Sequence, residues 1–260
     1  MKQKKRKIVA LHIVLALSLG AMAFFAMALV LDKRIKEQGQ EFYAAASEEF
    51  IPYDIIEIIE IPVSIAPPII EEAATPFIDF DTMRVNFPNI VGWIQSQGTV
   101  INYPIVQGLD NAYYINRLPD NSRHSMGSIF LDYRNSPDFS DQSIIIYGHD
   151  MYTGDMFASL RHYANQHYYE QHPNMYIYTP DQDYSLVLFA GYILDSAVEV
   201  PPMSFMDSAD FERFITDVRK RSIFTSNVEV NFEDRLVFLA TCVASGSVND
   251  RLIIVGKLTV

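Results

Sequence analysis

Three residues in the C-terminal half of the chain carry side chains that could act together on a carbonyl group. Cys242 is the only cysteine of the 260 residues and ends the apolar run 236–241. Arg251 stands just before a second apolar run, and His149 closes a third run further upstream. A thiol needs a basic or cationic partner to become a good nucleophile, and a guanidinium can neutralise the oxyanion that forms on attack. These residue types therefore indicate nucleophilic catalysis at an acyl group.

A lone cysteine also fits a structural role. Free cysteine is frequently buried and then behaves as a small, inert hydrophobe. One thiol allows no internal disulfide, so a fold exported from the cell would depend on its core alone. Spacing by itself leaves both interpretations of Cys242 open.

The elements that must position these side chains are short strands. Apolar runs between turn residues predict strands at 100–106, 128–132, 143–147, 175–178, 184–194, 228–231, 236–242 and 252–258. Pro104 favours an edge position for the first of them. The clearest helix is 208–221, whose apolar residues share one face. Two shorter segments, 79–87 and 155–163, also have apolar residues at helical spacing. Many short strands with one good helix predict a mostly β barrel or sandwich.

The N-terminus predicts a membrane anchor. Residues 1–7 form a basic tip, and residues 8–31 contain no charged side chain. At about 1.5 Å per residue this stretch can cross a hydrocarbon core of about 30 Å. The basic end should remain cytoplasmic, so the bulk of the chain should face outward. A cleaved signal peptide is the alternative, because Ala-Met-Ala occurs at 21–23 and 26–28. The length of the apolar stretch favours the anchor.

The rest of the chain divides into a spacer and one domain. Residues 32–78 begin with a polar stretch that could continue as a short helix, and then alternate acidic and branched apolar residues among prolines, which predicts an extended stalk. A partner-binding segment is the alternative for this stretch. Residues 79–260 suffice for one domain with its own core. The net charge is −12 and the basic residues do not gather in one outward-facing cluster, which argues against nucleic acid as a partner.

Several motifs, in one order, resemble the class B sortases of Gram-positive bacteria. The histidine region is Tyr147-Gly-His149, and the cysteine and arginine strands are Phe238-Leu-Ala-Thr-Cys242 and the run after Arg251. Further matching segments are Gly92-Trp-Ile94, Asn102-Tyr-Pro-Ile-Val-Gln-Gly108, Asn111-Ala-Tyr-Tyr114, Gly127-Ser-Ile-Phe-Leu-Asp132 and Tyr176-Ile-Tyr-Thr-Pro180. The chain departs from the family pattern at Phe238, where a threonine is usual, and at Ala240, where a serine is common.

The resemblance implies a sortase-type β-barrel with an N-terminal helical piece and a helix inserted before the last strands. It also implies a transpeptidase that cuts a C-terminal sorting signal of secreted proteins and joins them to an amine of peptidoglycan or lipid II. In this chain Cys242 would form the thioacyl intermediate, His149 would transfer protons and Arg251 would hold the oxyanion. No metal or organic cofactor is required. The enzyme would work outside the cell membrane.

By family position, six residues are expected to line the peptide groove: Asn111, Tyr147, Thr241, Ser196, Val200 and Pro201. Class B members often prefer motifs like Asn-Pro-x-Thr-Asn. Three alternatives stay open: a Cys-His peptidase that only hydrolyses, a pilus-polymerising sortase, and a catalytically silent peptide-binding module.

Overall fold

The computed structural model describes residues 2–50, 78–242 and 249–260, without the side chains of residues 2–11, 13–16 and 242. The chain forms two compact units, Met1–Phe42 and Tyr43–Val260. The second unit contains all the strands that are described below.

The first unit consists of most of helix α1 (Lys2–Phe50). Its described apolar side chains are exposed, including Leu17, Phe24 and Leu31. Among the described side chains, no helix combines the length and the apolarity that a membrane span requires. Residues 8–11 and 13–16 of the predicted anchor lie outside the described side chains. Of the predicted stalk, residues 32–50 are helical, and residues 51–77 lie outside the described residues.

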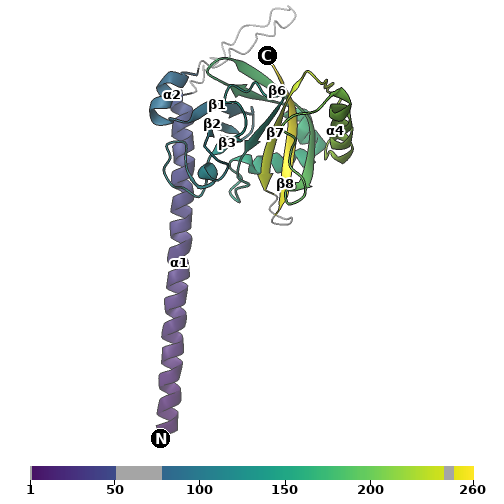
Figure 1. The fold of residues 1–260 in the computed structure, drawn as a ribbon. Coiled ribbons are helices and arrows are strands. Elements are labelled where there is room, and N and C mark those ends of the chain that lie inside the picture. The colour runs from purple at the N-terminus through teal and green to yellow at the C-terminus, as the bar shows by residue number, and fades with distance from the viewer. Residues whose placement is uncertain (1, 51–77, 243–248) are drawn as a thin grey trace, which may run out of the picture. The chain divides into compact units, whose positions relative to one another are not determined.

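Eight strands of the second unit close into a barrel (Figure 1). Their order around the barrel is β1, β2, β3, β4, β7, β8, β6, β5. The bounds are β1 Ile90–Gln95, β2 Asn102–Gln107, β3 Ile129–Leu131, β4 Ser143–Tyr147, β5 Asn174–Tyr178, β6 Asp183–Asp195, β7 Arg235–Cys242 and β8 Asp250–Thr259. Two pairs, β2 with β3 and β4 with β7, are parallel, and the others are antiparallel. The predicted β-barrel is confirmed.

Two predictions about strands were wrong, and one strand was not predicted. Residues 90–95 form β1 although their apolar pattern was not singled out, and residues 228–231 form no strand. Pro104 is not on an edge, because β2 lies between β1 and β3. It pairs with Trp93 of β1, whereas the ladder with β3 begins only at Ile105. The proline is therefore tolerated because its missing N–H falls outside that ladder.

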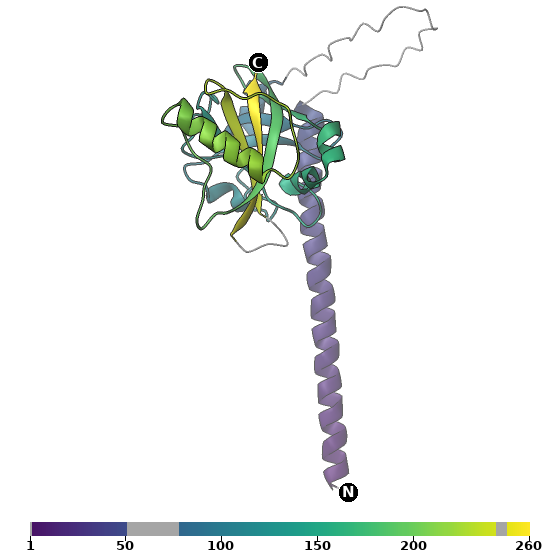
Figure 2. The ribbon, with the colours of Figure 1, turned by 90° about the vertical axis from the view of Figure 1, so that its right-hand side faces the viewer.

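The predicted helix at 208–221 is confirmed as α4 (Ser208–Arg221), which packs on the outside of the barrel (Figure 2). Its buried face presents Phe211, Ile215 and Val218 to a core cluster that includes side chains of β6, β7 and β8. The N-terminus is capped by Asp207, whose carboxylate accepts from the Asp210 amide at 2.8 Å.

Of the four shorter helices, the first precedes β1 and the other three lie between strands. They are α2 (Phe80–Asn86), η1 (Tyr113–Asn116), η2 (Phe157–Ala164) and α3 (Gln166–Gln171). Two of them, α2 and η2, confirm the helical spacing seen at 79–87 and 155–163. The η2 helix follows the β4 end that carries His149, and η1 precedes β3, so both flank the strand ends that matter below.

The last turns of α1 belong to the second unit. Tyr43, Ala46 and Phe50 are buried there. The Tyr43 hydroxyl donates to the Gly127 carbonyl at 2.5 Å, and its ring meets Tyr103 edge-on at 5.2 Å between centroids. This segment therefore contributes to the core, although its sequence reads only as a polar continuation of the helix.

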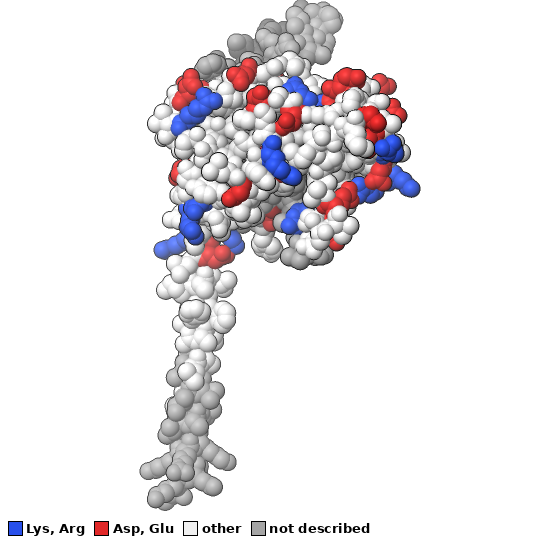
Figure 3. Space-filling model, viewed as in Figure 1, with Lys and Arg blue, Asp and Glu red and all other residues white. Residues whose placement is uncertain are grey.

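Charged side chains of both signs are interspersed on the face of the second unit that Figure 3 shows. Basic residues form no continuous patch on this face. A polyanion would be attracted by clustered basic side chains, and this face has no such cluster.

Candidate active site

Three adjacent strands bring the ends of the cysteine, histidine and arginine segments together. In the parallel pair of β4 and β7, Tyr147 lies opposite Ala240. His149 and Cys242 each follow that pair by two residues, and the Gly148 amide donates to the Ala240 carbonyl at 3.1 Å. In the antiparallel pair of β7 and β8, Cys242 lies opposite Arg251. The backbone thus places all three positions at one end of the barrel.

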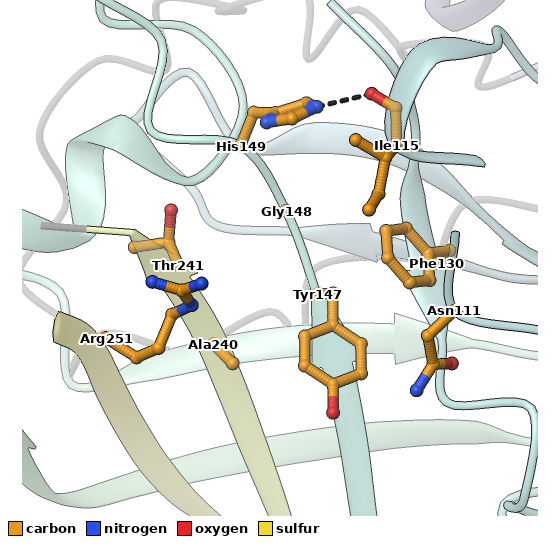
Figure 4. Close-up of a pocket in the computed structure, with 9 residues that line it drawn as sticks. All are labelled: Asn111, Ile115, Phe130, Tyr147, Gly148, His149, Ala240, Thr241 and Arg251. Carbon is orange, nitrogen blue, oxygen red and sulfur yellow. Dashed lines mark hydrogen bonds between the residues drawn. The ribbon is translucent and has the colours of Figure 1, made fainter. Parts of the chain in front are cut away.

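A pocket of about 320 Å³ opens at this end of the barrel (Figure 4). It is lined by Asn111, Ile115, Phe130, Tyr147, Gly148, His149, Ala240, Thr241 and Arg251. Two of the three predicted catalytic residues therefore share one pocket with three of the predicted groove residues. For Cys242 the structure describes the backbone, which ends β7 beside the pocket-lining Thr241.

The His149 imidazole is half-buried and is held by a backbone contact. Its Nε2 meets the carbonyl oxygen of Ile115 (Figure 4). Because a carbonyl can only accept, Nε2 carries the proton in this arrangement and Nδ1 is the acceptor of the neutral ring. The ring therefore has one nitrogen suited to take up a proton and one suited to donate.

Gly127 allows the close approach of Ile115 and His149. Its φ is +61°, a left-handed conformation that other residues rarely adopt. A Cβ at this position would lie 2.9 Å from Cδ2 of His149 and still closer to the Ile115 carbonyl oxygen. The glycine of the segment 127–132 thus keeps the histidine side of the pocket open.

Arg251 lies on the opposite side of the pocket from His149 (Figure 4). Its Nη1 donates to the Asp250 carbonyl at 3.0 Å. The carboxylate of Asp234, a conceivable surface partner, instead pairs with Lys257 at 3.2 Å. The arginine side chain is half-buried and lines the pocket.

Thr241 carries a buried hydroxyl beside Arg251. The residue is 3% exposed, and its Oγ1 makes no hydrogen bond to any described group. A buried polar atom without a partner is unusual and costs about 1–3 kcal/mol. Since Thr241 lines the pocket, a bound ligand is the natural partner for this hydroxyl.

Asn111 and Tyr147 occupy the other wall and share a partner. Both donate to one carboxylate oxygen of Asp132, at 2.9 Å from Asn111 Nδ2 and 3.0 Å from the Tyr147 hydroxyl. The Tyr147 ring also stacks on Phe130 at 5.2 Å between centroids. Burial and the neighbouring Asp132 charge together raise the pKa of Tyr147, so the hydroxyl stays protonated.

The other three predicted groove residues do not line this pocket, as far as the described residues show. Ser196 donates through its hydroxyl to the Asn249 carbonyl at 2.7 Å. Val200 is 64% exposed, and Pro201 is buried. They belong to the stretch between β6 and α4, for which the sequence offered no periodic pattern.

The pocket also includes residues for which the sequence assigned no role, namely Ile115, Phe130 and Gly148. Phe130 lies within the motif at 127–132, and Gly148 lies within the histidine motif. Ile115 belongs to η1, a 3₁₀ helix of four residues that has no periodic signal of its own. Their places follow from the barrel closure rather than from local sequence.

A β-barrel with these three positions at one end is the arrangement expected of an enzyme that transfers acyl groups through a thiol. Comparison with known proteins identifies the group. The Sortase domain family matches residues 94–259, which is most of the second unit. Sortase B of Listeria monocytogenes is 37% identical over 68% of this chain and 72% of its own. Sortase B of Staphylococcus aureus is 31% identical over 69% and 74%.

Solved structures agree with the sequence comparison. A crystal structure of Staphylococcus aureus sortase B has a TM-score of 0.65 at 30% identity and covers 69% of this chain and 86% of its own. A Bacillus anthracis protein described as similar to sortase B has a TM-score of 0.64 at 32% identity, with 69% and 82% covered. The chain belongs to the sortase family, within its class B. It is accordingly a sortase-type cysteine transpeptidase.

Proposed function

We propose that this enzyme cleaves a C-terminal sorting motif of secreted proteins and transfers them to an amine of the cell wall. The supporting observation is the strand register, in which Cys242 lies opposite Arg251 and His149 follows the neighbouring strand. One solved relative is titled as a Staphylococcus aureus sortase B–substrate complex, and another as sortase B complexed with triglycine. A peptide substrate and an amine acceptor are the partners that these complexes suggest.

In the first half of the reaction, the Cys242 thiol gives its proton to Nδ1 of His149, and the resulting thiolate attacks the carbonyl carbon of the motif's threonine. The oxyanion accepts hydrogen bonds from the Arg251 guanidinium. The C–N bond then breaks, His149 donates its proton to the leaving amine, and a thioester remains on Cys242.

In the second half, the acceptor amine attacks the thioester carbon. His149 takes the proton of this amine, the C–S bond breaks and a new amide forms. The product is the secreted protein joined to peptidoglycan or lipid II. No step requires a redox partner or a metal.

We further propose that residues 8–31 anchor the enzyme in the cell membrane with its catalytic domain outside. The support is the uncharged 24-residue run at 8–31 together with helix α1, which continues unbroken to Phe50. Full-length protein should then sediment with membranes, and external protease should release a fragment that begins within residues 32–78. A mature N-terminus just after Ala23 or Ala28 would instead indicate a cleaved signal peptide.

Product analysis tests the transfer reaction. Full-length protein in detergent is incubated with a library of sorting-motif peptides, with and without candidate amines, and the products are identified by mass. An amide between the N-terminal peptide fragment and the added amine is expected. A free carboxylate as the sole product, even at high amine concentration, would identify a hydrolase instead.

A further inference from the structure

One buried carboxylate behind the pocket collects five hydrogen bonds. Asp132 directly follows β3 and is fully buried. Its Oδ2 accepts from Arg134 Nη2 at 2.8 Å as well as from Asn111 and Tyr147. Its Oδ1 accepts from the backbone amide of Arg134 at 3.0 Å and from Arg134 Nε at 2.9 Å. Two of these five donors belong to pocket-lining residues.

The carboxylate sets the direction of both pocket hydrogen bonds, because an ionised carboxylate can only accept. The Asn111 amide is oriented from two sides: its Oδ1 accepts from the Tyr133 amide at 3.0 Å, and its Nδ2 donates to Asp132. One N–H of Asn111 then remains for a ligand. Tyr147 has a single hydroxyl proton, which it donates in the hydrogen bond to Asp132. Only the lone pairs of the hydroxyl oxygen therefore remain for a ligand.

We propose that Asp132 is a positioning residue that fixes the hydrogen-bond polarity of the peptide pocket. Through it, Asn111 presents a donor and Tyr147 presents an acceptor. A bound peptide must then offer a carbonyl oxygen to Asn111 and an N–H to Tyr147. The identity of the ligand as a sorting peptide rests on the function proposed above, whereas the polarity follows from the contacts of Asp132.

Arg134 keeps the Asp132 carboxylate charged. Burial disfavours the charged form, but the hydrogen bonds from Arg134, Asn111 and Tyr147 outweigh it and hold the pKa of Asp132 at about 2. The guanidinium contacts both oxygens while its own side chain is 42% exposed. The acceptor character of Asp132 therefore persists at every pH at which the enzyme would work.

A purely structural role for Asp132 is the competing explanation. Its backbone carbonyl accepts from Gln107 Nε2 at 3.0 Å, and the same glutamine reaches the Asn135 carbonyl at 2.7 Å. Asp132 could thus serve only to hold the turn after β3. That role predicts a loss of stability without a specific change in peptide recognition.

Kinetics of two variants of the full-length enzyme separate the explanations. Asp132→Asn keeps the size but places an amide where an acceptor is needed, so we expect the peptide KM to rise about tenfold or more, with kcat within about threefold. Arg134→Lys keeps the charge but loses the fork, and it replaces a partly exposed side chain, so folding should be preserved. For this variant we expect a smaller KM increase of about threefold.

Asp141→Asn is the matched control. This carboxylate lies in the same turn and accepts from Asn135 Nδ2 at 2.9 Å and the Ser136 amide at 2.7 Å. It should lower the melting temperature and leave the peptide KM unchanged. Equal KM values for wild type, Asp132→Asn and Arg134→Lys, or a KM increase of the same size in Asp141→Asn, would overturn the positioning role.

A double-mutant cycle adds a readout that a structural role would not move. If Asp132 acts through Tyr147, the KM effect of Asp132→Asn should shrink by severalfold in a Tyr147→Phe background. If the KM effects of Asp132→Asn and Tyr147→Phe simply multiply in the double variant, the two residues act independently, which would contradict the proposal.

The crystal structure of Asp132→Asn separates this proposal from the proposed function. A wild-type enzyme that cleaves no sorting peptide would overturn the function. Even in that case, the Asn111 amide and the Tyr147 hydroxyl should no longer both donate to residue 132 in the Asp132→Asn structure. Unchanged positions of both groups would overturn the positioning role by itself.

Discussion

The two walls of the pocket differ in how well their polar groups are satisfied. On the wall formed by β3, β4 and the residues before η1, Asn111 and Tyr147 both end on the Asp132 carboxylate. On the wall formed by β7 and β8, the Thr241 hydroxyl is buried without a partner among the described groups. The first wall is arranged before any ligand arrives, whereas the second retains a polar group that no described residue satisfies.

This contrast matches two tasks of an acyl-transfer enzyme. A preformed wall loses little conformational entropy when it binds a peptide, which favours recognition. A hydroxyl that is unsatisfied in the resting enzyme gains a hydrogen bond when a reacting group occupies the site, which favours the transition state if the bond forms only there. The predictions below test whether substitutions on the two walls act on these different steps.

The largest effects should come from the nucleophile and the proton carrier. Cys242→Ala should abolish cleavage, because a methyl group cannot form the thioester. His149→Ala should lower kcat by about 10²–10⁴-fold through lost proton transfer. Both are measured with a cleavable peptide, and circular dichroism verifies that the fold is retained. Residual cleavage by Cys242→Ala at wild-type rate would exclude the cysteine mechanism.

Substitution of Arg251 should act mainly on kcat. We expect Arg251→Ala to lose about 10²–10³ in kcat, the typical effect of removing one oxyanion donor. Arg251→Lys should recover only part of this, because lysine keeps the charge but not the planar fork. If Arg251 served only as a surface contact, both variants would turn over within about threefold of wild type and show only a slightly lower melting point.

The ionisation of Asp132 should make the free energy of unfolding depend on pH. The pKa of Asp132 is about 2 in the folded protein against an ordinary 3.8. A lowered pKa stabilises the fold above pH 3.8, and this contribution is lost as the pH falls towards 2. Between about pH 4 and pH 2, wild type should therefore lose about 1–2 kcal/mol more than Asp132→Asn. Parallel stability curves from urea unfolding of the two proteins would contradict this.

The β7/β8 wall was easier to predict from sequence than the Asp132 wall. Strands β7 and β8 contain the apolar runs 236–241 and 252–255, which Cys242 follows and Arg251 precedes, so both the strands and the candidate residues could be predicted. Asp132 lies in a segment that matched the family pattern, but its donors come from three places in the chain. Only the closed barrel brings those groups together.

Other differences between the predicted and the observed structure also arise from contacts between residues that are far apart in sequence. Strand β1 begins two residues after Pro88 and contains Gly92, both weak local signals, and it is specified by pairing with β2 and β5. The burial of Tyr43 depends on contacts with Gly127 and Tyr103, far away in sequence. Conversely, helix α4 was predicted with its correct bounds, because its amphipathic pattern is local.

The smallest effects should distinguish the two walls directly. Tyr147→Phe removes a satisfied hydroxyl and deprives Asp132 of a donor, so it should lower the free energy of unfolding by about 1 kcal/mol. Thr241→Val removes an unsatisfied hydroxyl with little change of shape. It should leave the free energy of unfolding unchanged or raise it by about 1 kcal/mol. Urea unfolding of the two variants measures the difference in sign.

Activity should move differently from stability in Thr241→Val. If a bound acyl group is the partner of the Thr241 hydroxyl, kcat/KM should fall about five- to twentyfold although the protein is no less stable, since one hydrogen bond made only with ligand is lost. Thr241→Ser is the control, because it keeps the hydroxyl and should retain most of the activity. A Thr241→Val enzyme that is destabilised as much as Tyr147→Phe and fully active would show that the hydroxyl is satisfied within the protein. The contrast between the two walls would then be lost.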